Sequence, residues 1–271
     1  MNIPVKNNKK LKITIIISYF YFNKKLKKII KMTDKDIKLQ TLWECSNIMV
    51  MDRMGYSDHG PTHVAIVSNI ALKLIRNLIK SGIEPNVVKD YELTEEDAEI
   101  IVVLGAFFHD VGNSIHRYNH ENNSITLALP FLDKLLDKIY DEKSKQIMIC
   151  EILHCITSHD SKVEVLTIEA GVVKFADALD MTEGRARIPF ERGKKDIYAV
   201  SALSIDEVKL SSSKDKPIKV DIIMNNSAGI FQVDNLLKNK LRNSPIEKYV
   251  SVTAKVKEGK EKKIIKNYEL K

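Results

Sequence analysis

All seven histidines of this 271-residue chain lie between positions 59 and 159. Two of them are followed directly by a carboxylate, in the pairs His109-Asp110 and His159-Asp160. Imidazole and carboxylate side chains together suit divalent first-row metals. Two such ions bridged by a carboxylate can activate water and neutralise charge on phosphoryl oxygens. The clustering therefore predicts a metal centre within one region of the fold. The remaining histidines of the cluster are His59, His63, His116, His120 and His154.

The same region also contains cysteines close to histidines. Cys150 with His154, and Cys155 with His159, are spaced at i,i+4, which raises the alternative of a zinc site. The two pairs point in different directions on a helix, and structural zinc sites use other spacings. Small buried cysteines on a core helix are therefore favoured. The chain has no G-x-x-x-x-G-K-[ST] phosphate loop.

Helices must position the histidines, because the apolar residues follow a helical period from about 40 to 188. Ser57 or Asp58, with Pro61, begins a helix that carries His63 and ends near Gly82. Four further helices are predicted, at 94–110, around Pro130 with a kink or break there, at 142–158 and at 167–183.

After position 190 the hydrophobic period changes from 3.6 to 2, which is typical of strands. Strands are predicted at 203–210, 218–224 and 250–256, the first with a bulge at Asp206-Glu207. An amphipathic helix over 233–242 separates the second strand from the third. The predicted fold class is mainly α, an all-α helical bundle followed by a small α+β domain of β-β-α-β order.

The net charge of +7 is unevenly placed along the chain. Residues 1–31 hold nine lysines and no acidic residue, and 255–271 hold seven lysines against three glutamates. These ends contribute +13 together, so residues 32–254 carry −6. An acidic body argues against nucleic acid as a partner, because such binding needs a basic surface.

The N-terminal stretch contains an apolar run of ten residues, 13–22, flanked by lysines. A bilayer span needs roughly 20 such residues, so integral membrane association is not expected. We predict that 1–31 is an extension outside the fold; a weak peripheral anchor and a signal peptide are the alternatives. Three cysteines are too few for a disulfide framework, which indicates a cytoplasmic protein.

Four residues carry a resemblance to a known family. His63, the pair His109-Asp110 and Asp177 are ordered and spaced like the H…HD…D signature of the HD-domain metal-dependent phosphohydrolases. The surrounding segments 107–112 and 174–185 add to the likeness. The resemblance covers roughly residues 55–188 and implies that these four side chains bind metal, with Asp110 bridging to a second ion where one exists.

The dinuclear branch of that family has two further histidines, and His120 and His159 lie where these are expected. His116 competes with His120 because both lie in one loop, and His154 competes with His159. Residues five apart on a helix differ by about 140°, so His154 and His159 cannot both face one site. His159 is preferred, and His59 is expected in a supporting or substrate-facing position.

Substrate contacts are predicted from the arginines nearest the metal ligands in the sequence, Arg117, Arg185 and Arg187. Guanidinium groups match phosphate oxygens, although arginines that cap a helix C-terminus are the alternative. Asp110 is expected to help orient the attacking water as well as bridge the ions. His116 is a candidate to protonate the leaving oxygen or to contact phosphate.

The resemblance implies a phosphohydrolase that cleaves a phosphate ester of a small molecule, with nucleotides as the leading class, by metal-activated hydroxide. The cofactor would be one or two divalent ions of Mn, Fe, Co, Ni, Zn or Mg. A non-catalytic regulatory module and a di-iron oxygenase with the same ligands are the alternatives. The domains predicted are 1–31, the HD-type domain 32–190, the α+β domain 191–256 and a lysine-rich tail 257–271. The α+β domain is expected to act as a lid or in a homodimer.

Overall fold

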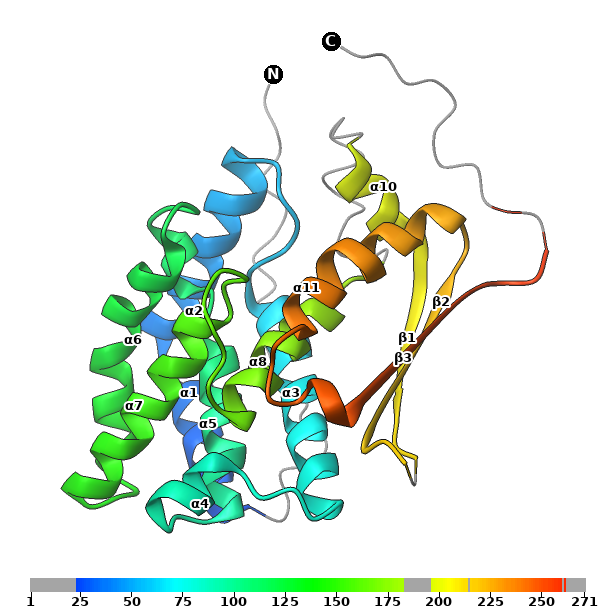
Figure 1. Ribbon diagram of the computed structural model, residues 1–271. Coiled ribbons are helices and arrows are strands. Elements are labelled where there is room, and N and C mark those ends of the chain that lie inside the picture. The colour runs from blue at the N-terminus through cyan, green and yellow to red at the C-terminus, as the bar shows by residue number, and fades with distance from the viewer. Residues whose placement is uncertain (1–22, 183–195, 214, 260, 262–271) are drawn as a thin grey trace.

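The computed structural model describes residues 23–182, 196–213, 215–259 and 261 of the chain. Helices make up the first part and a three-stranded sheet follows, which confirms the predicted fold class (Figure 1). None of the helices in these ranges has the length and apolar character needed to cross a bilayer. The α-helices of the first part are α1 Lys24–Thr33, α2 Ile37–Asn47, α3 Pro61–Lys80, α4 Asn86–Tyr91, α5 Glu95–Phe108, α6 His120–Leu136, α7 Glu142–Ser158 and α8 Ile168–Leu179.

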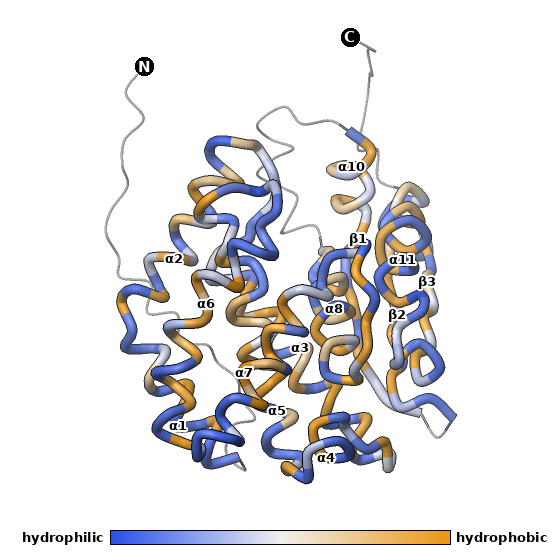
Figure 2. The backbone as a smooth tube through the Cα atoms, turned by 60° about the vertical axis from the view of Figure 1, so that its left-hand side comes forward, coloured by the Kyte–Doolittle hydropathy of each residue, from blue (hydrophilic) through white to orange (hydrophobic). Residues whose placement is uncertain are grey.

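Helix α5 is the centre of the bundle. It begins at a capping box in which Thr94 and Asp97 exchange hydrogen bonds, and three acidic residues fill its first turn. From Ile100 to Phe108 every side chain is buried, as expected for a helix surrounded by others. Helices α3, α7 and α8 pack around it, and Figure 2 shows apolar residues concentrated where these helices meet. The end of α5 is therefore rigidly held, and His109 and Asp110 follow directly.

The C-terminal residues 196–256, which we call the C-terminal unit, contain the sheet. Strands β1 Ile205–Ser211, β2 Ile218–Met224 and β3 Val250–Val256 lie in the order β1-β2-β3. β1 and β2 are antiparallel, whereas β2 and β3 are parallel. The register shifts between Ile205 and Glu207, which confirms the predicted bulge. The other elements of the unit are α10 Ile197–Leu203, η3 Ser227–Gly229, η4 Gln232–Leu237, α11 Lys238–Leu241 and η5 Glu247–Tyr249.

The C-terminal unit packs directly on the bundle and shares its hydrophobic core. Helix α11 lies against α8 (Figure 1). A Cβ added at Gly171 of α8 would lie 2.6 Å from Ser244 Oγ and 3.3 Å from a methyl group of Ile246. Glycine at this position therefore allows the two parts to approach closely. On the other side, Lys73 Nζ of α3 donates to the carbonyl of Leu210 at 2.9 Å.

The predicted boundary at residue 32 is wrong for residues 23–31. Asn23 caps α1 by accepting from Leu26 N, and its amide donates to Glu96 O at 2.8 Å. Leu26 and Ile29 have no exposed surface and belong to the main core. The lysine-rich composition concealed an amphipathic helix, whose apolar residues lie three and four positions apart. The predictions for residues 1–22 and 262–271 concern parts of the chain outside the described residues.

If α1 is part of the core, Ile29→Ala will lower the free energy of unfolding by about 2–5 kcal/mol, because it removes a buried side chain and leaves a cavity. The matched control is Lys24→Ala on the exposed face of the same helix, which should change stability by less than about 0.5 kcal/mol. Urea denaturation followed by circular dichroism measures both. Equal stability of the two variants would restore the boundary at residue 32.

Candidate metal centre

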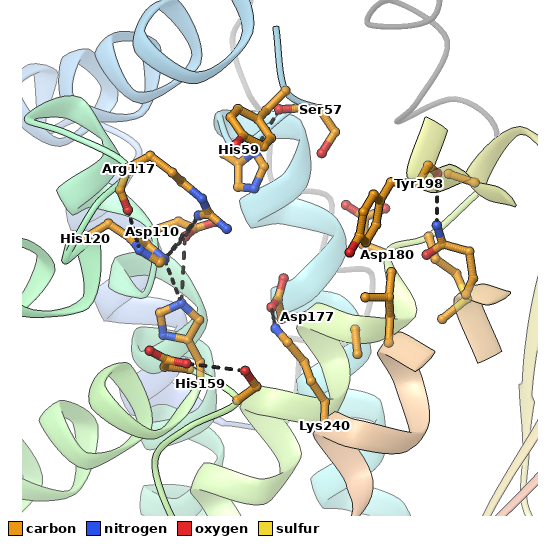
Figure 3. A pocket seen from close by; sticks show the side chains of 18 of the residues that line it. Ser57, His59, Asp110, Arg117, His120, His159, Asp177, Asp180, Tyr198 and Lys240 are labelled. Carbon is orange, nitrogen blue, oxygen red and sulfur yellow. Dashed lines mark hydrogen bonds and ion pairs between the residues drawn. The ribbon is translucent and has the colours of Figure 1, made fainter. Parts of the chain in front are cut away.

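A cavity of about 650 Å³ opens between the helical bundle and the C-terminal unit. The bundle contributes Asp110, His120, His159 and Asp177 to its lining. The C-terminal unit contributes residues from α10, η4 and α11, among them Lys240 (Figure 3). The polar side chains of the site thus come from both parts of the fold.

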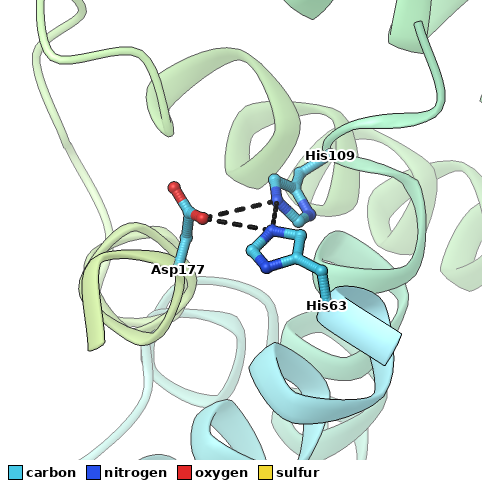
Figure 4. A group of neighbouring side chains, drawn as sticks. All are labelled: His63, His109 and Asp177. Atoms are coloured by element: carbon cyan, nitrogen blue, oxygen red, sulfur yellow. Dashed lines mark hydrogen bonds and ion pairs between the residues drawn. The ribbon is translucent and has the colours of Figure 1, made fainter. Parts of the chain in front are cut away.

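Two groups of three side chains could each hold a metal ion, and each group has at least one member in the cavity lining. In the first group, His63 comes from α3, His109 from the end of α5 and Asp177 from α8 (Figure 4). The two Nε2 atoms are 3.2 Å apart, and Asp177 Oδ1 lies 3.3 Å from that of His63 and 3.7 Å from that of His109. All three residues are buried.

The second group consists of Asp110, His120 and His159, which are also buried. Asp110 follows α5, His120 begins α6 and His159 follows α7. The Nε2 atoms of the two histidines are 3.1 Å apart, and Asp110 Oδ1 lies 3.2 Å from His120 Nε2 and 3.8 Å from His159 Nε2.

Asp110 joins the two groups. Its other oxygen, Oδ2, lies 3.4 Å from His63 Nε2 and 3.2 Å from His109 Nε2. Each carboxylate oxygen therefore faces one pair of histidines. This is the arrangement that a carboxylate needs to bridge two ions.

The hydrogen-bond partners of the Nδ1 atoms make the four histidines suitable as metal ligands through Nε2. The Nδ1 of His109 lies 2.8 Å from Ala106 O, and that of His159 lies 2.5 Å from Ile156 O. The Nδ1 of His120 lies 3.1 Å from Arg117 O, and that of His63 lies 2.6 Å from Asp180 Oδ2. These acceptors favour a proton on Nδ1, so each Nε2 can direct a lone pair at a metal ion once His109 has lost its second proton. Converging lone pairs are favourable with a cation among them, and imidazole with carboxylate suits Mn, Fe, Co, Ni or Zn.

The turn after α5 is held tightly enough to fix His109 and Asp110. Ser124 Oγ donates to His109 O at 2.8 Å and accepts from Gly112 N at the same distance. A Cβ at Gly112 would lie 2.0 Å from His120 O, so only glycine lets α6 come this close. Trp43 Nε1 donates to Phe107 O at 2.9 Å from the opposite side.

The charges of the site shift several pKa values. Burial opposes charge on His109, but the carboxylates of Asp110 and Asp177 outweigh it and raise its pKa to about 9. Burial would raise the pKa of Asp177, yet the ammonium of Lys240 and the nearby histidines hold it well below its usual range. The pKa of His159 is lowered by burial and by the positive charge of His109.

The structure brings together all six side chains predicted as ligands and decides between the competing histidines. His154 Nε2 accepts from Leu166 N at 3.2 Å and belongs to neither group, whereas His159 does. His116 is exposed, and its Nδ1 accepts from Tyr118 N at 2.9 Å. His116 lies outside the cavity lining, so its position does not support the predicted role as proton donor or phosphate contact.

The predicted substrate contacts have different outcomes. Arg117 lines the cavity, with Nη1 3.2 Å from His120 Nε2 and 3.7 Å from Asp110 Oδ1. Arg185 and Arg187 lie outside the described residues. His59 is buried at the cavity, as expected for a supporting or substrate-facing group.

Three residues of the site were missed by the sequence analysis. Asn113 donates from Nδ2 to Asp110 Oδ1 at 2.8 Å. The Asp180 carboxylate forms a hydrogen bond with His63 Nδ1, and Lys240 contacts Asp177 Oδ2. Asn113 and Asp180 each follow a predicted ligand by three residues, which is a signal that could have found them. Lys240 lies 63 residues from Asp177 in a different part of the fold, and no local pattern marks it.

The geometry can now be compared with known proteins. Residues 62–182 match the model of the HD domain, and this range contains all six side chains of the two groups. The chain belongs to the HD-domain superfamily. It is also 46% identical over 226 residues to the uncharacterized protein MJ1020 of Methanocaldococcus jannaschii, a match that covers 83% of this chain and 87% of that protein. This match is longer than the HD domain, so the similarity extends into the flanking residues.

Asp180 should set the metal affinity through His63. Asp180→Ala removes the acceptor that fixes the ring, and loss of such a partner typically weakens metal binding about 10–100-fold. Competition with a fluorescent chelator measures the affinity, and the control Asp234→Asn changes an exposed carboxylate of η4. Unchanged affinity in Asp180→Ala would show that the Asp180 contact does not orient a ligand.

The raised pKa of His109 predicts proton release on metal binding. In the metal-free protein His109 holds a proton at pH 7.5, and a metal at Nε2 must displace it. The proton stabilises the metal-free fold fully below pH 6.5, and this contribution is lost as the pH rises through about 9. Metal affinity should therefore increase over the same interval. Calorimetric titration at pH 7.5, in two buffers of different ionisation enthalpy, should show about one proton released; none would contradict the prediction.

Proposed function

We propose that this protein is a metal-dependent phosphohydrolase that hydrolyses a phosphate ester of a small molecule, with nucleotides as the substrate class. The observation that carries the proposal is the position of Asp110, whose two oxygens face two separate pairs of histidines. A carboxylate shared in this way is suited to two ions at the separation that in-line displacement at phosphorus requires.

The proposed ligands are divided between the two groups. His63, His109 and Asp177 would hold one ion, and His120 and His159 the other, with Asp110 shared. When bound, divalent ions supply Lewis-acid stabilisation of the phosphoryl oxygens and activate water as the nucleophile. Asn113 donates to Asp110 Oδ1 and so fixes the plane of the shared carboxylate.

Arg117 is the proposed phosphate contact from the bundle. Its guanidinium lies beside the second group at the cavity, and its side chain keeps 34% of its surface exposed. A fork of donors in that position can bind two phosphate oxygens and orient the ester toward the ions. Burial of the surrounding groups limits competition from water, which strengthens the contact.

The size and lining of the cavity support a nucleotide-sized substrate. A volume of about 650 Å³ falls within the range of small-molecule sites, about 300–1,000 Å³. The wall formed by the C-terminal unit includes Tyr198, Ala202 and Leu236. An aromatic ring beside small apolar side chains suits a planar organic group, whereas the polar wall opposite suits its phosphate.

The shared carboxylate should be indispensable. Asp110→Ala is expected to reduce bound metal and to lower kcat/KM for a phosphate ester by at least about 100-fold, because it removes a ligand from both groups. Metal analysis and hydrolysis of p-nitrophenyl phosphate, bis(p-nitrophenyl) phosphate and a panel of linear and cyclic nucleotides test this with Mn²⁺, Co²⁺ or Ni²⁺. The control Asp133→Asn alters an exposed carboxylate of α6 and should leave both quantities unchanged.

Other results would reject the proposal. Full metal content with no hydrolysis of any ester would favour a regulatory module. Iron in the purified protein together with an oxygen-dependent product would favour an oxygenase. Retained hydrolysis in Asp110→Ala would show that the reaction does not use the shared carboxylate.

A further inference from the structure

One cation of the site comes from outside the HD domain. Lys240 lies in α11 of the C-terminal unit, and its Nζ contacts Asp177 Oδ2 at the cavity (Figure 3). Its side chain is 24% exposed, whereas that of Lys238 in the same helix is 63% exposed. The two lysines have the same chemistry and opposite environments, so the inward position of Lys240 reflects the helix face on which it lies.

That helix face is directed at the cavity. Gln232, Leu236 and Lys240 are spaced four residues apart, and all three line the cavity. Residues three or four apart share one face of a helix. Asp234 and Lys238 pair with each other on an exposed face, with Nζ 2.9 Å from Oδ1. The sequence from 232 to 240 thus presents one face to the site and another to solvent.

The contact with Asp177 leaves the oxygen that faces the histidines untouched. Oδ1 of Asp177 faces His63 and His109, whereas Oδ2 contacts Lys240. Lys240 therefore lies beside the first metal group without taking the place of one of its ligand atoms. An ammonium has three donors, so a contact to one carboxylate oxygen is compatible with further contacts to oxygens of a ligand in the cavity.

Among the described residues, a cationic side chain lies beside each metal group. Arg117 lies next to Asp110 and His120, and Lys240 lies next to Asp177. Figure 3 shows the two cations reaching the cavity from different parts of the fold. A positive side chain placed beside a divalent ion is repelled by it, unless an anion lies between them. Two such cations on either side of two ions form an environment for a bound anion.

Docking of the C-terminal unit does not require this ion pair. Ile205, Ile218, Ile222 and Ile246 have no exposed surface and join the main hydrophobic core. Burial of these apolar side chains is the main source of stability at such an interface. The position of Lys240 therefore calls for a role at the cavity.

We propose that Lys240 is a phosphate-binding residue that the C-terminal unit supplies to the metal centre, on the side opposite to Arg117. The inference rests on the proposed function in assuming that a phosphate ester is bound there. It assigns the C-terminal unit a part in substrate binding, so the HD domain and this unit form one site together.

The test measures binding without turnover. The full chain is loaded with Mn²⁺, freed of excess metal and titrated with inorganic phosphate in a calorimeter. Lys240→Met should weaken phosphate binding by about tenfold or more, since a contact between charged groups is lost. Lys240→Arg keeps the positive charge and should retain most of the affinity. The matched control Lys238→Met removes the same charge from the exposed face and should bind phosphate like the unaltered protein.

Metal content and thermal unfolding of each variant separate this role from a structural one. Unchanged metal content in Lys240→Met with weakened phosphate binding supports the proposal. Equal phosphate affinity in the two methionine variants overturns it, as does absence of phosphate binding by the unaltered protein. Loss of metal from Lys240→Met, restored in Lys240→Arg, also overturns it and would make Lys240 a positioning residue for Asp177.

The outcome for the proposed hydrolase is separate. Phosphate binding that depends on Lys240 without hydrolysis of any ester would sustain this inference and reject the proposed function. With an active enzyme, Lys240→Met should raise KM for p-nitrophenyl phosphate more than it lowers kcat. Hydrolysis with unaltered KM in Lys240→Met would reject the inference and leave the proposed function standing.

Discussion

The carboxylate of Asp110 lies among four imidazole rings, and this arrangement constrains the rest of the bundle. Each of its oxygens is within 3.8 Å of two Nε2 atoms. In the metal-free protein the carboxylates of Asp110 and Asp177 hold a proton on His109, whose pKa they raise to about 9. The rings are held in place, because every Nδ1 lies against an acceptor from the protein. The fold thus presents four imidazole nitrogens around one carboxylate, a donor set that suits divalent metal ions.

Holding these rings requires several helix ends to meet at one point. The side chains come from α3, the end of α5, the start of α6, the end of α7 and α8. Helix α5 can serve as the axis because its polar residues are confined to the capping box and the first turn. The residues that follow are apolar and buried. Gly112 then permits α6 to approach until a Cβ would collide with His120 O. The short turn after α5 therefore determines both how closely α6 packs and where His109 and Asp110 lie.

The sequence was sufficient where a functional residue is close in the chain to the element that holds it. His109 and Asp110 end a strongly apolar helix. The helical period showed that His154 and His159 cannot both face one site, and the structure places His159 there. The sequence around His116 and His120 shows no hydrophobic period, and the start of α6 at His120 was not predicted, so geometry had to decide between them. Helix α1 was missed because its lysines dominate the composition, although Leu26 and Ile29 are fully buried. Lys240 could not be predicted at all, since its relation to Asp177 depends on how two parts of the chain pack.

In the proposed enzyme, the HD domain and the C-terminal unit have different roles. The six side chains that could hold metal lie within residues 62–182, where the sequence matches the model of the HD domain. A metal centre alone stabilises charge at any phosphoryl group and discriminates little between esters. Discrimination needs a wall shaped for the organic part of the substrate, and Tyr198 and Leu236 of the C-terminal unit line that side of the cavity. Because α11 packs on α8, which carries Asp177, a change in the wall also reaches a proposed metal ligand. In the proposed enzyme, substrate binding and chemistry would be coupled through α8.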